Sequence, residues 1–531
     1  MNILINQESL NKFLSDAIDI NKYNLNSTFK LSSFVIEDKI GETIILYNAI
    51  NSFLAELTYS EYKYVLTLTG NELLQSNYSA LIYNYILVPQ DFDVSFFKDY
   101  VETQVWNKTP IEEFFNKISS YVIFTTTDCN ARCFYCYERG TAKIKMSKKT
   151  AEDVANFIVN EYTTNKLEEI HIEWFGGEPL YNIEAIDTIV DILVANNVKF
   201  TSTMISNSLL FTPQLCHTAK TKWNLTNIQI TLDGTKDVYN KIKNYINLKP
   251  EDNPFETVIT NTKCLLSEGI HVSIRLNAEL YNIDDLKILI KYLDREIGHP
   301  KNFSVYIALL FEKISGIAHT EEELSKLYLK VEELMMFSNY YKYNFVENTI
   351  KRANNLQRGK HCMIDSGNSI TILPDGKISS CEHFTDKNLF GSIYTPKKDW
   401  DYELVKKMAT ETHEKNGKCC KDCPFYSVCR PVSYCETERV CSEEQFNLMM
   451  LSNKLSLRNK YYSIKNRNTM NNNCDNQSSY HLNRIANELE LLNDYKSLTL
   501  WERIKILLGM TVYRDPHKIQ QTDYNNKSKE S

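Results

Sequence analysis

The chain has 531 residues, of which 43% are hydrophobic and 24% are charged, and its formal net charge is −7. This length allows several domains, each with a core of its own. The negative charge argues against a broad nucleic-acid surface, because phosphate binding requires clustered Lys and Arg.

The amino-terminal region, residues 1–118, is predicted to be a separate α+β unit. It begins without the basic start and apolar run of a signal peptide, and no stretch of the chain approaches the roughly 18 apolar residues of a membrane helix. We therefore expect a cytoplasmic protein without a membrane partner. The segment SFVIEDKIGETIILYN (33–48) predicts a hairpin around Gly41, and amphipathic helical segments and a short apolar run (80–88) follow it.

The next region, residues 119–335, alternates strand-like and helix-like segments. Helical spacing of apolar residues follows the capping candidate Ser147, and similar patterns lie around 183–196, 255–268 and 283–296. Alternation of this kind predicts parallel strands joined by right-handed crossovers, in an open sheet or a barrel. The six predicted strands are 121–127, 169–175, 200–206, 228–234, 271–277 and 303–309.

Polar and glycine-rich motifs follow the carboxyl ends of these strands, the edge at which parallel α/β proteins bind ligands. Three cysteines follow the first strand and GGEP (176–179) follows the second. SNS (206–208) and LDG (232–234) end the third and fourth, and Arg275 and Asn277 close the fifth. We therefore expect one site along this rim.

The cysteines indicate metal chemistry, because a reducing compartment disfavours disulfides. Cys129, Cys133 and Cys136 lie on one short loop. Three thiolates can hold a cubane iron–sulfur cluster and leave one iron free for a substrate or cofactor. A zinc site is the alternative, but it needs a fourth ligand, and Asp128 and Glu138 are poor partners for a soft structural site.

The stretch CNARCFYC (129–136), with Tyr135 just before the last cysteine, resembles the CxxxCxxC signature of the radical S-adenosylmethionine (radical SAM) superfamily. GGEP at the end of the second strand strengthens the resemblance. It implies an α/β fold with a partial (β/α)6 barrel, a 4Fe-4S cluster and S-adenosyl-L-methionine as cofactors, and cleavage of that cofactor to a 5′-deoxyadenosyl radical that abstracts a substrate hydrogen.

The resemblance also implies roles for single residues. Gly176 and Gly177 would let the backbone approach the amino group of the cofactor, and Pro179 would hold Glu178 extended so that carbonyls face it. Tyr135 would lie beside the adenine. Ser206 and Arg275 match positions that bind the ribose and the methionine carboxylate, with Asn207 and Asn277 as weaker candidates.

The region 336–445 resembles the SPASM domain, whose cysteines bind auxiliary clusters. Cys362, Gly376 and Cys381 match its CX9–15GX4C pattern, and Cys420, Cys423 and Cys429 match the start of CX2CX5CX3C. The next family cysteine would fall at Ser433, whereas the chain has Cys435. The resemblance implies one cluster on Cys420, Cys423, Cys429 and Cys441, and a second on Cys362, Cys381 and Cys435 without an eighth cysteine. Zinc ribbons and disulfides are the alternatives.

Most SPASM-bearing relatives modify peptides or proteins. The amino-terminal region resembles the winged-helix element that binds a precursor peptide as an added strand, with a structural cap as the alternative. The expected partners are a precursor peptide or protein and a flavodoxin- or ferredoxin-type electron donor. Glu382, His383 and Asp365 are candidates for a catalytic base.

The expected function is a peptide maturase that installs a thioether or carbon–carbon crosslink. The alternatives are an anaerobic sulfatase-maturating, formylglycine-forming enzyme and a non-catalytic iron–sulfur protein. The remaining segment, 446–531, has an Asn-rich linker (466–479) and two helical patterns, 481–495 and 498–509.

Overall fold

A computed structural model describes residues 1–5, 22–48, 51, 53–92, 113–249, 251–310, 367–384 and 387–410, with scattered single positions between 323 and 465. The chain divides into two units, Met1–Val440 and Cys441–Ser531. Within the described part, no helix is long and apolar enough to cross a membrane. Asp365, the linker at 466–479, both carboxyl-terminal helical patterns and every predicted auxiliary ligand except Cys381 lie outside the described residues.

The amino-terminal region forms a small antiparallel sheet with short helices. Its strands lie in the order β1 (Asn2–Ile5), β5 (Leu54–Thr58), β4 (Thr43–Asn48) and β3 (Val35–Ile40). The hairpin predicted at 33–48 is confirmed as β3 and β4, and Gly41 adopts a positive φ in their turn. Three short helices follow β5 along the chain: α2 (Tyr59–Val65), α3 (Gly70–Gln75) and α4 (Ser79–Tyr83). A separate pair of strands is formed by β2 (Phe29–Leu31) and β6 (Leu87–Pro89).

Six parallel strands form the central sheet, in chain order, which confirms the predicted alternation. The bounds of these strands differ little from the predicted ones. The largest difference is in the fourth strand, which begins at Leu225, three residues before the predicted start at 228. The strands are β7 (Ser120–Thr126), β8 (Ile170–Gly176), β9 (Phe200–Ser206), β10 (Leu225–Leu232), β11 (His271–Ala278) and β12 (Phe303–Leu309).

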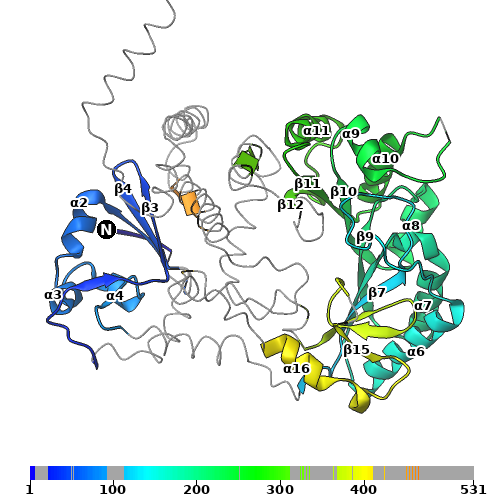
Figure 1. The fold of residues 1–531 in the computed structure, drawn as a ribbon, viewed down its shortest axis with the longest axis horizontal. Coiled ribbons are helices and arrows are strands. Elements are labelled where there is room, and N and C mark those ends of the chain that lie inside the picture. The colour runs from blue at the N-terminus through cyan, green and yellow to red at the C-terminus, as the bar shows by residue number, and fades with distance from the viewer. Residues whose placement is uncertain are drawn as a thin grey trace, which may run out of the picture. The chain divides into compact units, whose positions relative to one another are not determined.

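Helices cover one side of this sheet, visible on the right of Figure 1. Helix α6 (Lys148–Thr164) begins at the predicted cap, because the Ser147 hydroxyl accepts the backbone N–H of Thr150. The side chains on the helix side, such as Ile172 and Trp174 of β8, are fully buried in one large apolar core. The other helices of this region are α7 (Ile183–Ala195), α8 (Pro213–Thr221), α9 (Lys236–Lys243), α10 (Pro254–Ser267) and α11 (Ile283–Glu296).

The segment that carries Cys381 continues the same sheet. Strand β13 (Ser369–Ile372) pairs in parallel with β7, and β14 (Lys377–Ser379) and β15 (Leu389–Ser392) extend the sheet antiparallel. Gly376, the glycine of the predicted auxiliary motif, turns the chain between β13 and β14 with a φ of +82°. Helix α16 (Tyr402–Thr410) follows. The hydrogen-bonded backbone therefore fixes Cys381 relative to the central strands.

Candidate functional site

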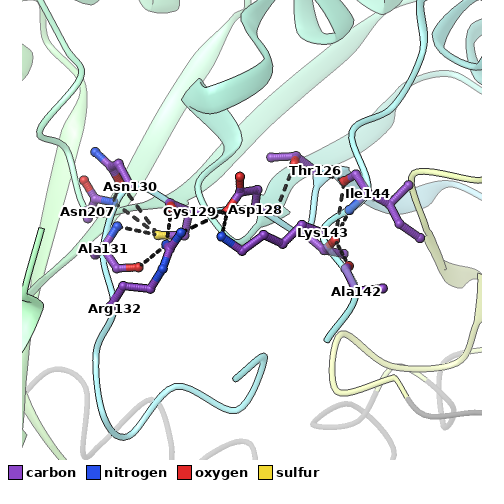
Figure 2. Close-up of polar contacts among 11 residues, drawn as sticks. Thr126, Asp128, Cys129, Asn130, Ala131, Arg132, Ala142, Lys143, Ile144 and Asn207 are labelled. Carbon is purple, nitrogen blue, oxygen red and sulfur yellow. Dashed lines mark hydrogen bonds and ion pairs between the residues drawn. The ribbon is translucent and has the colours of Figure 1, made fainter. Parts of the chain in front are cut away.

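The cysteine loop leaves the sheet at the carboxyl end of β7 and is anchored by Asp128. The carboxylate of Asp128 accepts the N–H of Cys129 at 2.9 Å and forms ion pairs with Lys143 at 3.0 Å and Arg132 at 3.5 Å. The guanidinium of Arg132 turns back to donate to the carbonyl of Cys129. Figure 2 shows these contacts on both sides of the loop. The loop is thus folded by its own polar groups.

The sulfur of Cys129 lies among hydrogen-bond donors. The N–H of Ala131 reaches it at 3.3 Å and the amide nitrogen of Asn207 at 3.9 Å. Asn207 also donates to the Oδ1 of Asn130 at 2.7 Å. The Nδ2 of Asn130 is buried and has no hydrogen-bond partner among the described residues. Iron–sulfur clusters accept such N–H contacts at their sulfurs. An unpaired buried donor beside a cysteine therefore fits a cluster or the cofactor bound to it.

Burial keeps the three thiols protonated in the absence of a metal. It raises the pKa of Cys129 to about 12, helped by Glu178, and the pKa of Cys136 to about 11, helped by Glu138. Burial also raises the pKa of Cys133. Metal binding deprotonates thiols outright. Among the described residues, no three His, Cys, Asp or Glu side chains are grouped to hold a single ion, whereas a cluster binds each cysteine to a different iron.

The two glycines of GGEP are required by close backbone contact. A side chain on Gly176 would place its Cβ 2.1 Å from the carbonyl oxygen of Thr126, and one on Gly177 would meet that of Asp128 at 2.4 Å. The N–H groups of Gly177 and Glu178 donate to these same carbonyls, both at 3.0 Å. The turn after β8 is therefore fastened directly to the start of the cysteine loop.

Glu178 connects the second and third strands at the rim. Its carboxylate, 1% exposed, accepts the hydroxyl of Ser206 and the N–H of Asn207, both at 2.8 Å. Burial raises the pKa of Glu178 to about 7, against the opposing effect of these hydrogen bonds. The Ser206 hydroxyl also accepts the N–H of Ser208 at 2.9 Å. Glu178 and Ser206, both predicted to bind the cofactor, thus bind each other.

Tyr135 belongs to a buried polar network beneath the loop. Its hydroxyl donates to the two carboxylate oxygens of Asp233, at 2.9 and 2.8 Å, and accepts from the Lys243 ammonium at 3.0 Å. Asn277 donates to Asp233 at 3.0 Å, and its own Oδ1 accepts the Nε of Arg275 at 2.9 Å. The network brings together three predicted site residues from the loop and β11.

A ring contact joins the auxiliary segment to the cysteine loop. The ring of His383 lies 4.2 Å from that of Tyr137, which follows Cys136 in the loop. The N–H of His383 donates to the sulfur of Cys381 at 3.4 Å, and the Cys381 thiol contacts the Glu382 carboxylate at 3.6 Å. Glu382 and His383 thus lie with Cys381 near the loop.

Sequence reasoning missed Asn130, Asp233, Lys243 and Glu173 as members of the site. Asp233 lies in the LDG motif and Glu173 in the alternating strand HIEWF, so both had a signal. Glu173 faces away from the helices, and burial followed by the nearby Glu382 raises its pKa to about 7. Lys243 is one of two lysines in the last turn of α9 and has no sequence signal of its own.

The region that contains the cysteine loop is similar to known proteins. A family described as a 4Fe-4S single cluster domain matches residues 120–249. An uncharacterized protein of Methanocaldococcus jannaschii is 25% identical over 281 residues, which are 51% of this chain and 87% of the relative. The radical SAM cyclopropyl synthase TigE of Paramaledivibacter caminithermalis is 22% identical over 276 residues, 46% of this chain and 55% of TigE.

A solved structure, native anSMEcpe with bound AdoMet, shares the fold. It superposes with a TM-score of 0.50 at 15% sequence identity, and the match covers 67% of this chain and all of that one. The predicted mixed α/β fold with a parallel sheet is confirmed by this likeness and by the strand order.

We expect Gly176→Ala to lower both iron uptake and thermal stability, because its Cβ would overlap the Thr126 carbonyl. The matched control is Gly140→Ala, which also has a positive φ (+91°) but has nothing within 4 Å of the added carbon. The control carries only the strain of a side chain at positive φ, roughly 1–2 kcal/mol. Iron content after anaerobic reconstitution and the melting temperature measure both effects. Equal values for the two variants would contradict the assigned role of Gly176.

We expect Glu178→Gln to flatten the dependence of stability on pH. The folded protein holds this proton more tightly than the unfolded chain, so the free energy of unfolding falls as pH rises from 4.5 to about 7. The contribution is at most about 3 kcal/mol. Melting temperatures across this interval give the slope, with Glu184→Gln, an exposed glutamate of α7, as the control. Parallel curves for wild type and Glu178→Gln would refute the expectation.

Proposed function

We propose that this chain, a radical SAM protein, is a maturase of a ribosomally synthesised peptide and forms a thioether or carbon–carbon crosslink. The observation that carries the proposal is the loop of three cysteines, packed against the glycine turn and a rim of polar side chains. Cys129, Cys133 and Cys136 would hold a 4Fe-4S cluster. When bound, the cluster supplies the electron that splits S-adenosyl-L-methionine and so produces the radical that abstracts a substrate hydrogen.

The residues around the loop would bind and orient the cofactor. The Nδ2 of Asn130, which has no partner in the part of the chain that the structure describes, would offer a donor beside Cys129. The Nε of Arg275 is held by Asn277, which directs the rest of the guanidinium. Gly176 and Gly177 keep the neighbouring backbone close to the loop. The Tyr135 hydroxyl is fully engaged with Asp233 and Lys243, so only its ring is free to contact the adenine.

Auxiliary clusters would accept the electron that crosslinking releases. Cys381 is fixed by the sheet beside Tyr137 and His383, and the remaining proposed ligands are Cys362, Cys420, Cys423, Cys429, Cys435 and Cys441. Glu382, which is next to Cys381 and whose charge helps to raise the pKa of Glu173, is a candidate base. The reductant would be a flavodoxin- or ferredoxin-type protein.

A peptide substrate is supported by the amino-terminal sheet. Within the described residues, β3 (Val35–Ile40) is an edge strand of its sheet and pairs with β4. Peptides bind such edges through main-chain hydrogen bonds. We propose that a leader segment of the precursor binds there.

The reaction is tested with reconstituted full-length protein, a precursor peptide, S-adenosyl-L-methionine and a reductant. We expect release of 5′-deoxyadenosine and a peptide mass lower by two hydrogens, and loss of both with Cys133→Ala. Cys216→Ala, which changes a buried cysteine of α8, is the control. Deoxyadenosine release with unchanged peptide mass would exclude crosslinking, and an aldehyde in the product would indicate formylglycine. Full turnover by Cys133→Ala would reject the proposal.

The leader site is tested by hydrogen exchange. Added precursor is expected to slow amide exchange in Val35–Ile40 and to leave α2, α3 and α4 unchanged, because only the strand gains hydrogen bonds. A scrambled leader of the same composition is the control. Unchanged exchange in β3 under saturating precursor would refute the edge as the binding site.

A further inference from the structure

We propose that the two charges of the buried ion pair Lys243–Asp233 shift the reduction potential of the cluster held by the cysteine loop in opposite directions, so that their balance tunes it. The inference rests on the proposed function, since it needs the cluster. Lys243 and Asp233 are positioning residues in this proposal: their charges act on the cluster, and neither side chain touches the substrate.

The pair is enclosed and fixed in place. The Lys243 ammonium lies 3.0 Å from Asp233, with side chains 5% and 0% exposed. Tyr135 bridges the two charges, and Asn277 and the side chain of Asn282 add hydrogen bonds to the carboxylate and backbone carbonyl of Asp233. Charges buried in this way are screened little by solvent or salt.

The lysine is joined to the cysteine loop by its backbone as well. Its carbonyl accepts the N–H of Arg132 at 2.8 Å and lies 4.0 Å from the sulfur of Cys133. Asn244, in the left-handed conformation, ends α9 immediately afterwards, and the N–H of Ile246 donates to the carbonyl of Asn130 at 2.9 Å. The end of α9 therefore holds the loop at three points.

The two charges act on the loop in opposite directions. The Lys243 ammonium is positive and the Asp233 carboxylate is negative, and both are hydrogen-bonded to Tyr135 of the loop. Reduction brings one electron from the flavodoxin-type donor to the cluster and moves no atom or proton, so it adds one negative charge. Net charge around a cluster is one of the factors that set its potential. The ammonium therefore favours reduction and the carboxylate opposes it.

The proposal predicts shifts of opposite sign in two variants. In reconstituted full-length protein, Lys243→Met should lower the reduced-to-oxidised ratio at a fixed potential about tenfold, which is about 59 mV for one electron. Asp233→Asn should raise it by a similar factor. The double variant should return toward wild type, and it removes the risk that one buried charge left alone prevents folding. Potentiometric titration followed by electron paramagnetic resonance gives the ratio.

Two controls separate charge from structure. Lys241→Met removes an exposed lysine of the same helix and should leave the potential unchanged. Lys243→Arg keeps the charge and should stay near wild type. Shifts of the same sign in Lys243→Met and Asp233→Asn, or no shift, at wild-type iron content would overturn the inference and leave the proposed function intact. Wild-type protein that takes up no iron would overturn both.

Discussion

The close packing of the Gly176–Gly177 turn on the backbone of residues 126–128 is the constraint on which the site depends. Two carbonyls at the end of β7 accept hydrogen bonds from the turn at the end of β8, and no side chain fits between them. This contact fixes where the cysteine loop leaves the sheet. From the same turn, Glu178 reaches the end of β9, so the rim segments after three strands are joined in one hydrogen-bonded unit.

Next to the cysteine loop the protein buries an ion pair, Lys243–Asp233, instead of apolar side chains. Burying an ion pair rarely adds stability, because the cost of desolvation offsets the attraction. The Lys243–Asp233 pair is nevertheless fully enclosed, and the hydrogen bonds of Tyr135, Asn277 and Asn282 satisfy its atoms. Such an arrangement holds β10, β11, the end of α9 and the cysteine loop in one relative position. A rigid loop is what a catalytic metal centre requires of its ligands.

The central sheet could be predicted because its strands are short apolar runs separated by amphipathic helices with clear caps. The cysteine loop and GGEP could be placed on one rim because parallel strands end at the same edge. The pairing of β13 with β7 could not be predicted, because about 250 residues separate the two strands and no local pattern encodes the contact. The same holds for Lys243, whose role depends on the helix end that brings it to Asp233. The contacts of Tyr135 could not be predicted either, because its hydroxyl partners, Asp233 and Lys243, come from other elements.

The parallel pairing of β13 with β7 also bears on how the chain can be divided. A version that stops at residue 335 would keep all six central strands and the cysteine triad, yet it would lack the neighbour of β7. Its outer strand would then present unpaired backbone along an apolar run that includes Val122 and Phe124, a template for aggregation with other chains. We therefore expect the six central strands and the strands β13–β15 to fold as one unit.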